Sequence, residues 1–154
     1  MKRVILVAAL LAATALATPP GWAARKSPAA AGQCGAQRSV EAEQAIRYMT
    51  DLMVASSACR NTTYAEFALR NRLVIIDYQK AMIGRLHGKA AFDRWNTSLA
   101  NQAAMKEAVV PIAQFCQQAE PLMKQASALD TKGFRAFAAA QAAGASGQAA
   151  KCGK

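Results

Sequence analysis

The sequence is poor in the residues from which catalytic and metal sites are built. It holds one histidine, His87, and nine carboxylates dispersed along 154 residues. The four cysteines are far apart, which argues against a Cys-X-X-Cys redox pair, a zinc or iron–sulfur site and covalent haem attachment. No G-x-S-x-G turn accompanies the histidine, so no hydrolytic triad is indicated. These absences predict a protein that is not an enzyme.

The position of His87 is explained by a structural role at the end of a helix, without catalysis or metal binding. His87 precedes Gly88 where a helix is expected to end, and a basic side chain there suits the negative end of the helix dipole. A haem or metal site formed by His87 with Met49, Met53 or Met82 is the alternative. Methionines at helical spacing usually belong to a core, so we expect no cofactor and no metal.

Long hydrophobic runs are also missing, apart from one at the start. Residues 4–17 are apolar, follow a basic start and are too few to span a bilayer. Ala15-Leu16-Ala17 places small residues at a cleavage site, so a signal peptide is predicted over residues 1–17, with cleavage after Ala23 as the alternative. An Ala-rich leader is typical of bacteria. We therefore expect a periplasmic protein with no transmembrane segment in its mature chain.

Three ranges are predicted beyond the leader. Residues 18–38 form a flexible segment, residues 39–143 a helical bundle domain, and residues 144–154 a flexible tail. The two flexible ranges are rich in small residues and lack hydrophobic periodicity. From residue 39 onward, apolar residues recur at helical spacing.

That spacing divides the domain into helices. They are predicted over about 39–59, 63–88 and 90–107, then from Pro111 and from Asp130. Ser39 and Asp130 suit helix N-caps, and Pro121 should kink or end the fourth helix. Short connections imply antiparallel neighbours. The predicted fold class is all-α: an up-down bundle of four main helices plus a short C-terminal helix, stapled by disulfides.

The stretch ASSACRNTTYAEF, residues 55–67, is predicted to be a tight connection between two helices. Thr63 and Glu66 have the spacing of a capping box. Asn61 and Thr62 can cap or turn equally well. Cys59 then lies at the end of the apolar stripe of the first helix.

The cysteines are predicted to form two disulfides, because their number is even and the compartment is oxidising. Cys59 ends the first helix, and Cys116 lies in the early turns of the fourth, which starts at the same end of the bundle. Cys59–Cys116 is therefore a geometrically reasonable pair. Cys34 and Cys152 are left to pair with each other and to tie the termini.

Positive charge is the main compositional signal. The formal charge is +10, and losing two cations with the leader lowers it to about +8. Such a charge favours acidic partners. Nucleic acid is not expected, because the basic residues are scattered and the protein is exported. The second predicted helix and its exit carry the best candidate surface for an anionic partner: Arg70, Arg72, Lys80, Arg85 and Lys89.

Three stretches carry a resemblance. LMVASSACRNTTYAEF, WNTSLANQAA and FCQQAE resemble segments of small exported all-helical proteins of alphaproteobacteria, most of which have no assigned function. The resemblance covers roughly residues 45–125. It implies a disulfide between Cys59 and Cys116, the pair that the bundle geometry favours, and implies no activity.

Three functions are compatible with these features. The first is a non-enzymatic periplasmic binding or accessory protein that docks on a larger exported or membrane-associated partner with an acidic surface. The second is a stress or chaperone-like protein that opens to expose apolar surface. The third is the haem or metal binder using His87 and methionines.

Overall fold

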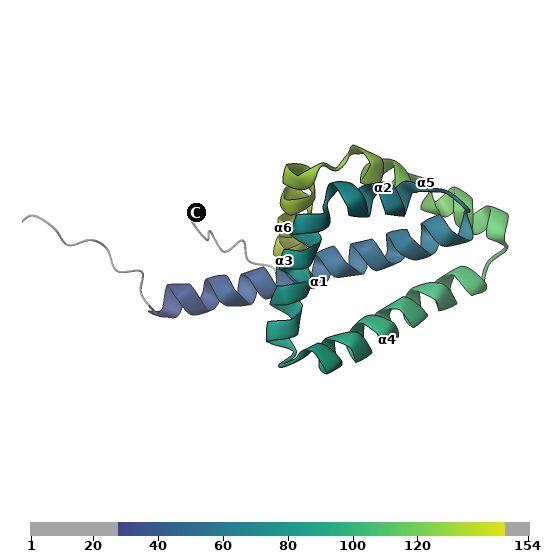
Figure 1. The fold of residues 1–154 in the computed structure, drawn as a ribbon. Coiled ribbons are helices and arrows are strands. Elements are labelled where there is room, and N and C mark those ends of the chain that lie inside the picture. The colour runs from purple at the N-terminus through teal and green to yellow at the C-terminus, as the bar shows by residue number, and fades with distance from the viewer. Residues whose placement is uncertain (1–27, 147–154) are drawn as a thin grey trace, which may run out of the picture.

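The computed structural model describes residues 28–146 (Figure 1). Within this range the chain forms six helices and no strand, which confirms the all-α class. The helices are α1 (Pro28–Ala58), α2 (Thr63–Arg70), α3 (Arg72–Arg85), α4 (Lys89–Ala108), α5 (Ile112–Ala128) and α6 (Thr131–Ser146). None of them is both long enough and apolar enough to cross a membrane. The predicted signal peptide lies outside the described residues.

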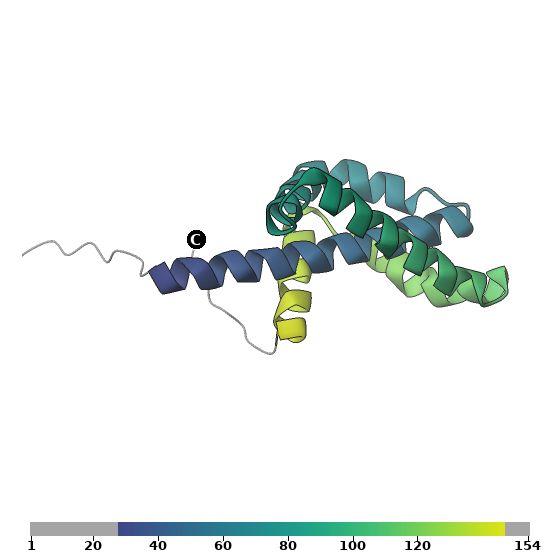
Figure 2. The same cartoon turned by 90° about the horizontal axis from the view of Figure 1, so that it is seen from below.

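Helix α1 is the axis of the fold, and each of the other described helices contacts it. Figures 1 and 2 show α4 and α5 beside the C-terminal half of α1, while α3 and α6 cross α1 nearer its middle. The α4–α5 connection lies near the C-terminal end of α1, away from the α2–α3 junction. The predicted up-down bundle of four helices is not confirmed, because two helices cross the axis instead of running along it.

Helix α1 begins at Pro28, not at Ser39. Proline suits the first turn and the alanines after it are strong helix formers, which outweighs the glycines in this stretch. Ser39 is therefore no N-cap: its hydroxyl donates to the carbonyl of Gly35 one turn earlier. Helix α1 therefore includes residues 28–38 of the segment that was predicted to be flexible. Helix α6 continues to Ser146, into the range predicted as the tail.

The α1–α2 connection is as tight as predicted, but other residues cap it. The backbone N–H of Tyr64 donates to the Ser56 hydroxyl (2.9 Å), and that of Thr63 donates to the Asn61 side chain (3.1 Å). The Thr62 hydroxyl, not that of Thr63, contacts Glu66 (2.7 Å). Ser56 and Asn61 thus satisfy the first N–H groups of α2.

Arg60, two residues beyond the end of α1, has a left-handed conformation, with φ 53°. Its N–H donates to Ser57 O and the next N–H donates to Ser56 O, which is the Schellman pattern. Glycine usually occupies this position because a side chain there costs about 1–2 kcal/mol.

Arg60→Gly is therefore expected to raise the free energy of unfolding by about 0.5–1 kcal/mol, the relief of strain less the extra entropy of an unfolded glycine. Urea unfolding measures the gain. Arg60→Ala is the control, because it removes the side chain but keeps the strain and should change little. An equal gain in both variants would contradict this explanation.

Asn71 breaks the single helix that was predicted over residues 63–88. Its side chain is fully buried and its amide donates to Phe67 O (3.1 Å) and Leu129 O (3.2 Å). Asparagine is a poor mid-helix residue because its side chain competes for backbone groups. The chain consequently changes direction sharply between α2 and α3 (Figure 1).

Prolines and caps delimit the remaining helices largely as predicted. Pro111 precedes α5, and Pro121 lies inside α5, which continues to Ala128. Pro121 therefore does not end the helix. The Asp130 carboxylate accepts a hydrogen bond from the N–H of Gly133 (2.7 Å), as expected of an N-cap.

The core centres on an aromatic cluster contributed by four helices. The Phe134 ring lies 4.8 Å from Phe67 and 5.7 Å from Tyr78, both edge-to-face, and 6.2 Å from Tyr48. Such geometry adds to the energy of burial. Leu52 of α1 and Met82 of α3 are buried in the same core. The cluster fixes α6 and α3 to the axis.

The two core tyrosines make the fold sensitive to alkali. Burial raises the pKa of Tyr48 to about 12. Burial, and secondly a 2.6 Å hydrogen bond to the Glu41 carboxylate, raise the pKa of Tyr78 further. An unfolded tyrosine ionises near pH 10, so their contribution is complete below that pH and is lost as the pH rises toward the folded pKa values.

Stability is therefore expected to fall between about pH 10 and 12. Unfolding by urea at several pH values tests this. The double variant Tyr48→Phe/Tyr78→Phe should show a smaller decline over this range. An unchanged pH profile in the double variant would count against the assignment.

Candidate functional site

The Cys59–Cys116 disulfide is present, as predicted. It joins the residue after the end of α1 to the beginning of α5, with a Cα–Cα distance of 5.6 Å. The predicted pairing is confirmed even though the predicted up-down bundle is not, because the end of α1 and the beginning of α5 lie side by side. The predicted Cys34–Cys152 pair is outside what the structure describes, because only the backbone of Cys34 is described and Cys152 lies beyond residue 146.

Arg70, the first residue of the predicted basic surface, is engaged within the chain. Its guanidinium donates to three carbonyls at the end of α5 and just beyond it: Leu129 O (3.1 Å), Ala126 O (3.0 Å) and Ser127 O (3.3 Å). A cation at a helix C-terminus is stabilised by the helix dipole. Arg70 therefore serves as a cap that connects α2 to α5.

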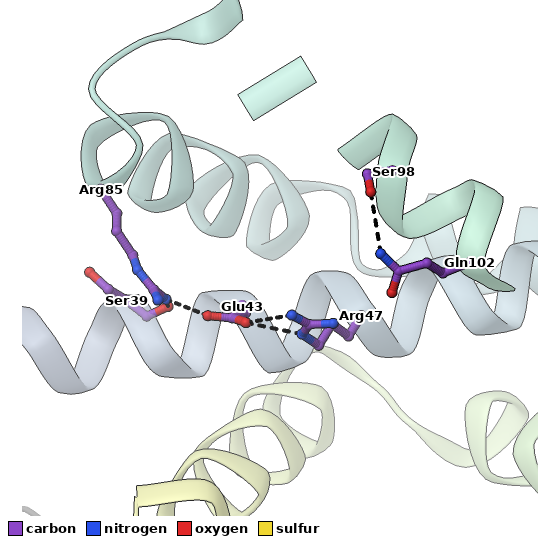
Figure 3. Close-up of polar contacts among 6 residues, drawn as sticks. All are labelled: Ser39, Glu43, Arg47, Arg85, Ser98 and Gln102. Carbon is purple, nitrogen blue, oxygen red and sulfur yellow. Dashed lines mark hydrogen bonds and ion pairs between the residues drawn. The ribbon is translucent and has the colours of Figure 1, made fainter. Parts of the chain in front are cut away.

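Arg85 is engaged in the same way. Figure 3 shows its guanidinium reaching Glu43 of α1, at 2.6 Å, with Arg47 on the other side of the carboxylate at 2.8 Å. Partial burial alone would raise the pKa of Glu43, but the hydrogen bonds and charges of Arg47 and Arg85 outweigh it and hold the pKa below its usual value. In α4, shown in the same view, Gln102 donates to Ser98. Arg85 thus ties α3 to α1.

The other three predicted cations are exposed. Arg72 and Lys80 lie on α3 and Lys89 begins α4, and none of them forms an ion pair among residues 28–146. Lys80 lines a hollow of about 350 Å³ between α1 and α3, together with Arg38 and Asp77. Asp77 is paired with Arg135 of α6 at 2.9 Å. The predicted surface is therefore smaller than five residues, and Arg38 extends it from α1.

Two leucines project from the α2–α3 corner. Leu69 is 78% exposed and Leu73 is 77% exposed, on either side of Asn71. Neither leucine can turn into the core, because Phe67, Asn71 and Val74 occupy the inward face. These leucines were missed in the sequence. Their positions off the apolar stripe of the predicted helix were the available signal.

A second group of exposed apolar residues lies where α4 ends, the chain turns and α5 begins, here called the apolar tip (residues 104–113). Met105 is 70% exposed, Val109 is 79% exposed and Ile112 is 51% exposed. Sequence reasoning also missed the tip. The signal was an apolar run, Val109-Val-Pro-Ile112, placed where the chain must turn instead of inside a helix.

A groove opens between α1, α4 and α5 and includes residues next to the tip. Its volume is about 240 Å³. Apolar groups of the three helices line most of it, and Asp51 and Lys106 bring opposite charges. The lining residues are Asp51, Val54, Ala55, Ala103, Lys106, Phe115, Gln118, Ala119 and Leu122. Apolar lining with few polar groups is typical of small-ligand or side-chain pockets.

His87 and the methionines are differently placed. His87 is exposed, with φ 58°, and its N–H donates to Gly84 O at the end of α3. Met49 and Met82 are buried in the core, while Met53 is partly exposed. Among the described residues no group of three or more histidine, cysteine or carboxylate side chains could hold a metal ion. Comparisons of the chain with protein-family models, with curated proteins and with solved structures return no match.

Proposed function

We propose that this chain is an exported, non-enzymatic binding protein that docks on a larger exported or membrane-associated protein through the apolar tip. The observation that carries the proposal is the exposure of Met105, Val109 and Ile112 around the α4–α5 turn. Single exposed apolar residues are ordinary, whereas contiguous ones mark interaction sites.

The surroundings of the tip support this role. Cys116 lies one helical turn beyond Ile112, so the disulfide holds the base of the tip to α1. A rigid base lowers the entropy lost on binding. The groove beside the tip, about 240 Å³, could receive an apolar side chain of the partner. The exposed residues of the tip can insert into a partner protein, and the groove can accept one of that protein's side chains.

The charge of the chain favours a partner with an acidic surface. The whole sequence has 19 lysines and arginines against nine carboxylates. Charges of one sign speed association with a surface of the opposite sign and make it sensitive to salt. Complex formation should therefore weaken as the ionic strength rises.

Photo-crosslinking in cells of the source organism tests the proposal. A photoreactive amino acid replaces Val109 in one variant and Leu69 in the other, two positions of nearly equal exposure. We expect Val109 to give one dominant crosslinked protein, and Leu69 to give none of that product. An additional Ile112→Asp substitution should abolish the crosslink from Val109. Equal yields from both positions, or many products from Val109, would contradict a specific partner and favour the chaperone-like alternative.

A further inference from the structure

We infer that the outer face of the α2–α3 corner binds the surface of a phospholipid bilayer with anionic headgroups. We call this surface the corner face, and it consists of Leu69, Arg72, Leu73, Lys80 and Arg38. It is separate from the apolar tip, so it adds a second contact to the proposed function and does not depend on it.

The leucines supply the apolar part of this contact. Both are more than three-quarters exposed, and Leu73 and Lys80 are seven residues apart on α3, hence on one side of the helix. Asn71 is fully buried between the leucines and Arg70 is bonded to the end of α5, so the corner is held in place. A helix face that mixes exposed leucines with cations is the pattern of interfacial membrane contact.

A hollow beside the leucines supplies the polar part. It measures about 350 Å³ and is lined by Arg38 and Ser39 of α1 and by Asp77 and Lys80 of α3. The carboxylate in it, Asp77, is already neutralised by Arg135 at 2.9 Å. Arg38 and Lys80 thus leave the hollow with an excess of positive charge, and it lies about 10 Å along α3 from Leu73. An anionic headgroup fits this charge while the leucines enter the bilayer.

The size of the corner face favours lipid over an acidic protein. A stable protein interface needs about 800 Å² on each partner with a packed apolar centre. The hollow beside the two leucines is lined mainly by polar and charged side chains, so it offers no such centre, whereas the groove beside the apolar tip is lined mainly by apolar ones. A bilayer is fluid and adapts to the shape of the corner. Each lysine or arginine near an anionic membrane surface strengthens the binding by a similar amount, so no exact arrangement of charges is required.

Vesicle co-sedimentation of the full exported protein tests the inference. The vesicles consist of phosphatidylcholine alone, or of phosphatidylcholine mixed with an equal amount of phosphatidylglycerol. We expect binding to the mixed vesicles only. Leu69→Ser/Leu73→Ser should lower the partition coefficient at least tenfold. Arg38→Ser/Lys80→Ser should lower it about fivefold for each cation removed.

The matched control is Met105→Ser/Val109→Ser, which removes two apolar groups of similar exposure (70% and 79%) from the tip and should leave partitioning unchanged. All variants change exposed residues, and circular dichroism checks that they fold. Binding to phosphatidylcholine alone, absence of binding to either vesicle, or loss of binding in the tip variant would overturn the inference. Tight binding to immobilised polyglutamate that survives Leu69→Ser/Leu73→Ser would do so too, because it would assign the face to an acidic protein.

Discussion

Replacing both Cys59 and Cys116 by alanine is expected to lower the free energy of unfolding by about 4 kcal/mol. The disulfide closes a loop with a sequence separation of 57 residues. Without the crosslink, the unfolded chain regains the entropy of that open loop, which gives about 4 kcal/mol by the chain-entropy estimate. Urea unfolding followed by circular dichroism measures the loss, which is a large share of the stability of an ordinary domain.

Replacing both cysteines, instead of one, leaves no unpaired thiol to form wrong disulfides. Ser57→Ala is the matched control, since it alters an exposed side chain at the same corner without touching the crosslink. It should change the stability by less than about 0.5 kcal/mol. A loss below about 1 kcal/mol in the double variant would mean that the loop is already closed in the unfolded state.

Phe134→Ala is expected to cost about 3–5 kcal/mol. The Phe134 ring is fully buried and is the only aromatic ring of the described chain in edge-to-face contact with both Phe67 and Tyr78. Its removal leaves a cavity where α2, α3 and α6 meet on α1. The measurement is again urea unfolding, with the m value compared to check that the variant still unfolds in one step.

Two controls separate packing from the mere loss of an aromatic residue. Phe115→Ala removes a ring that is only partly buried, at the groove, and should cost clearly less. Phe134→Leu retains most of the buried volume and should cost about 1–1.5 kcal/mol. Equal losses for Phe134→Ala and Phe115→Ala would show that the aromatic cluster is not the centre of the core.

Hydrophobic spacing predicted the helices well, because burial on α1 follows the helical period that the sequence displays. Phe67, Val74, Tyr78 and Met82 recur at this spacing in the sequence and are all buried. The sharp turn at Asn71 escaped prediction. It depends on a hydrogen bond from this side chain to Leu129 O, a residue distant in sequence, and local spacing cannot reveal such a contact.

Helix ends were harder to predict than helix interiors. The residues of the α1–α2 connection were recognised, yet Thr63 was given the capping role that Ser56 and Asn61 perform. Several hydroxyl and amide side chains compete for the same few N–H groups there. Which side chain accepts these hydrogen bonds depends on the direction in which the chain leaves α1. The left-handed backbone of Arg60 sets that direction.

The predicted basic surface separates into two kinds of residue once the tertiary contacts are known. Arg70 donates to carbonyl groups at the end of α5, and Arg85 forms an ion pair with Glu43. Arg72 and Lys80 remain exposed. In sequence, these four arginines and lysines are equivalent. The Cys59–Cys116 disulfide was predictable because it requires only that the end of α1 and the beginning of α5 lie at the same end of the fold. It does not require that the arrangement of all the helices be known.

The disulfide also determines how force would pass through the molecule. A partner that pulls on the apolar tip acts one helical turn from Cys116, and the covalent bond carries that load directly into the end of α1. Helix α1 has 31 residues and is therefore about 46 Å long. The force is then distributed over all the helices that pack on α1, and it does not act on the contacts of α4 alone. A tip mounted in this way resists detachment of its own helix even though α4 and α5 contact each other little.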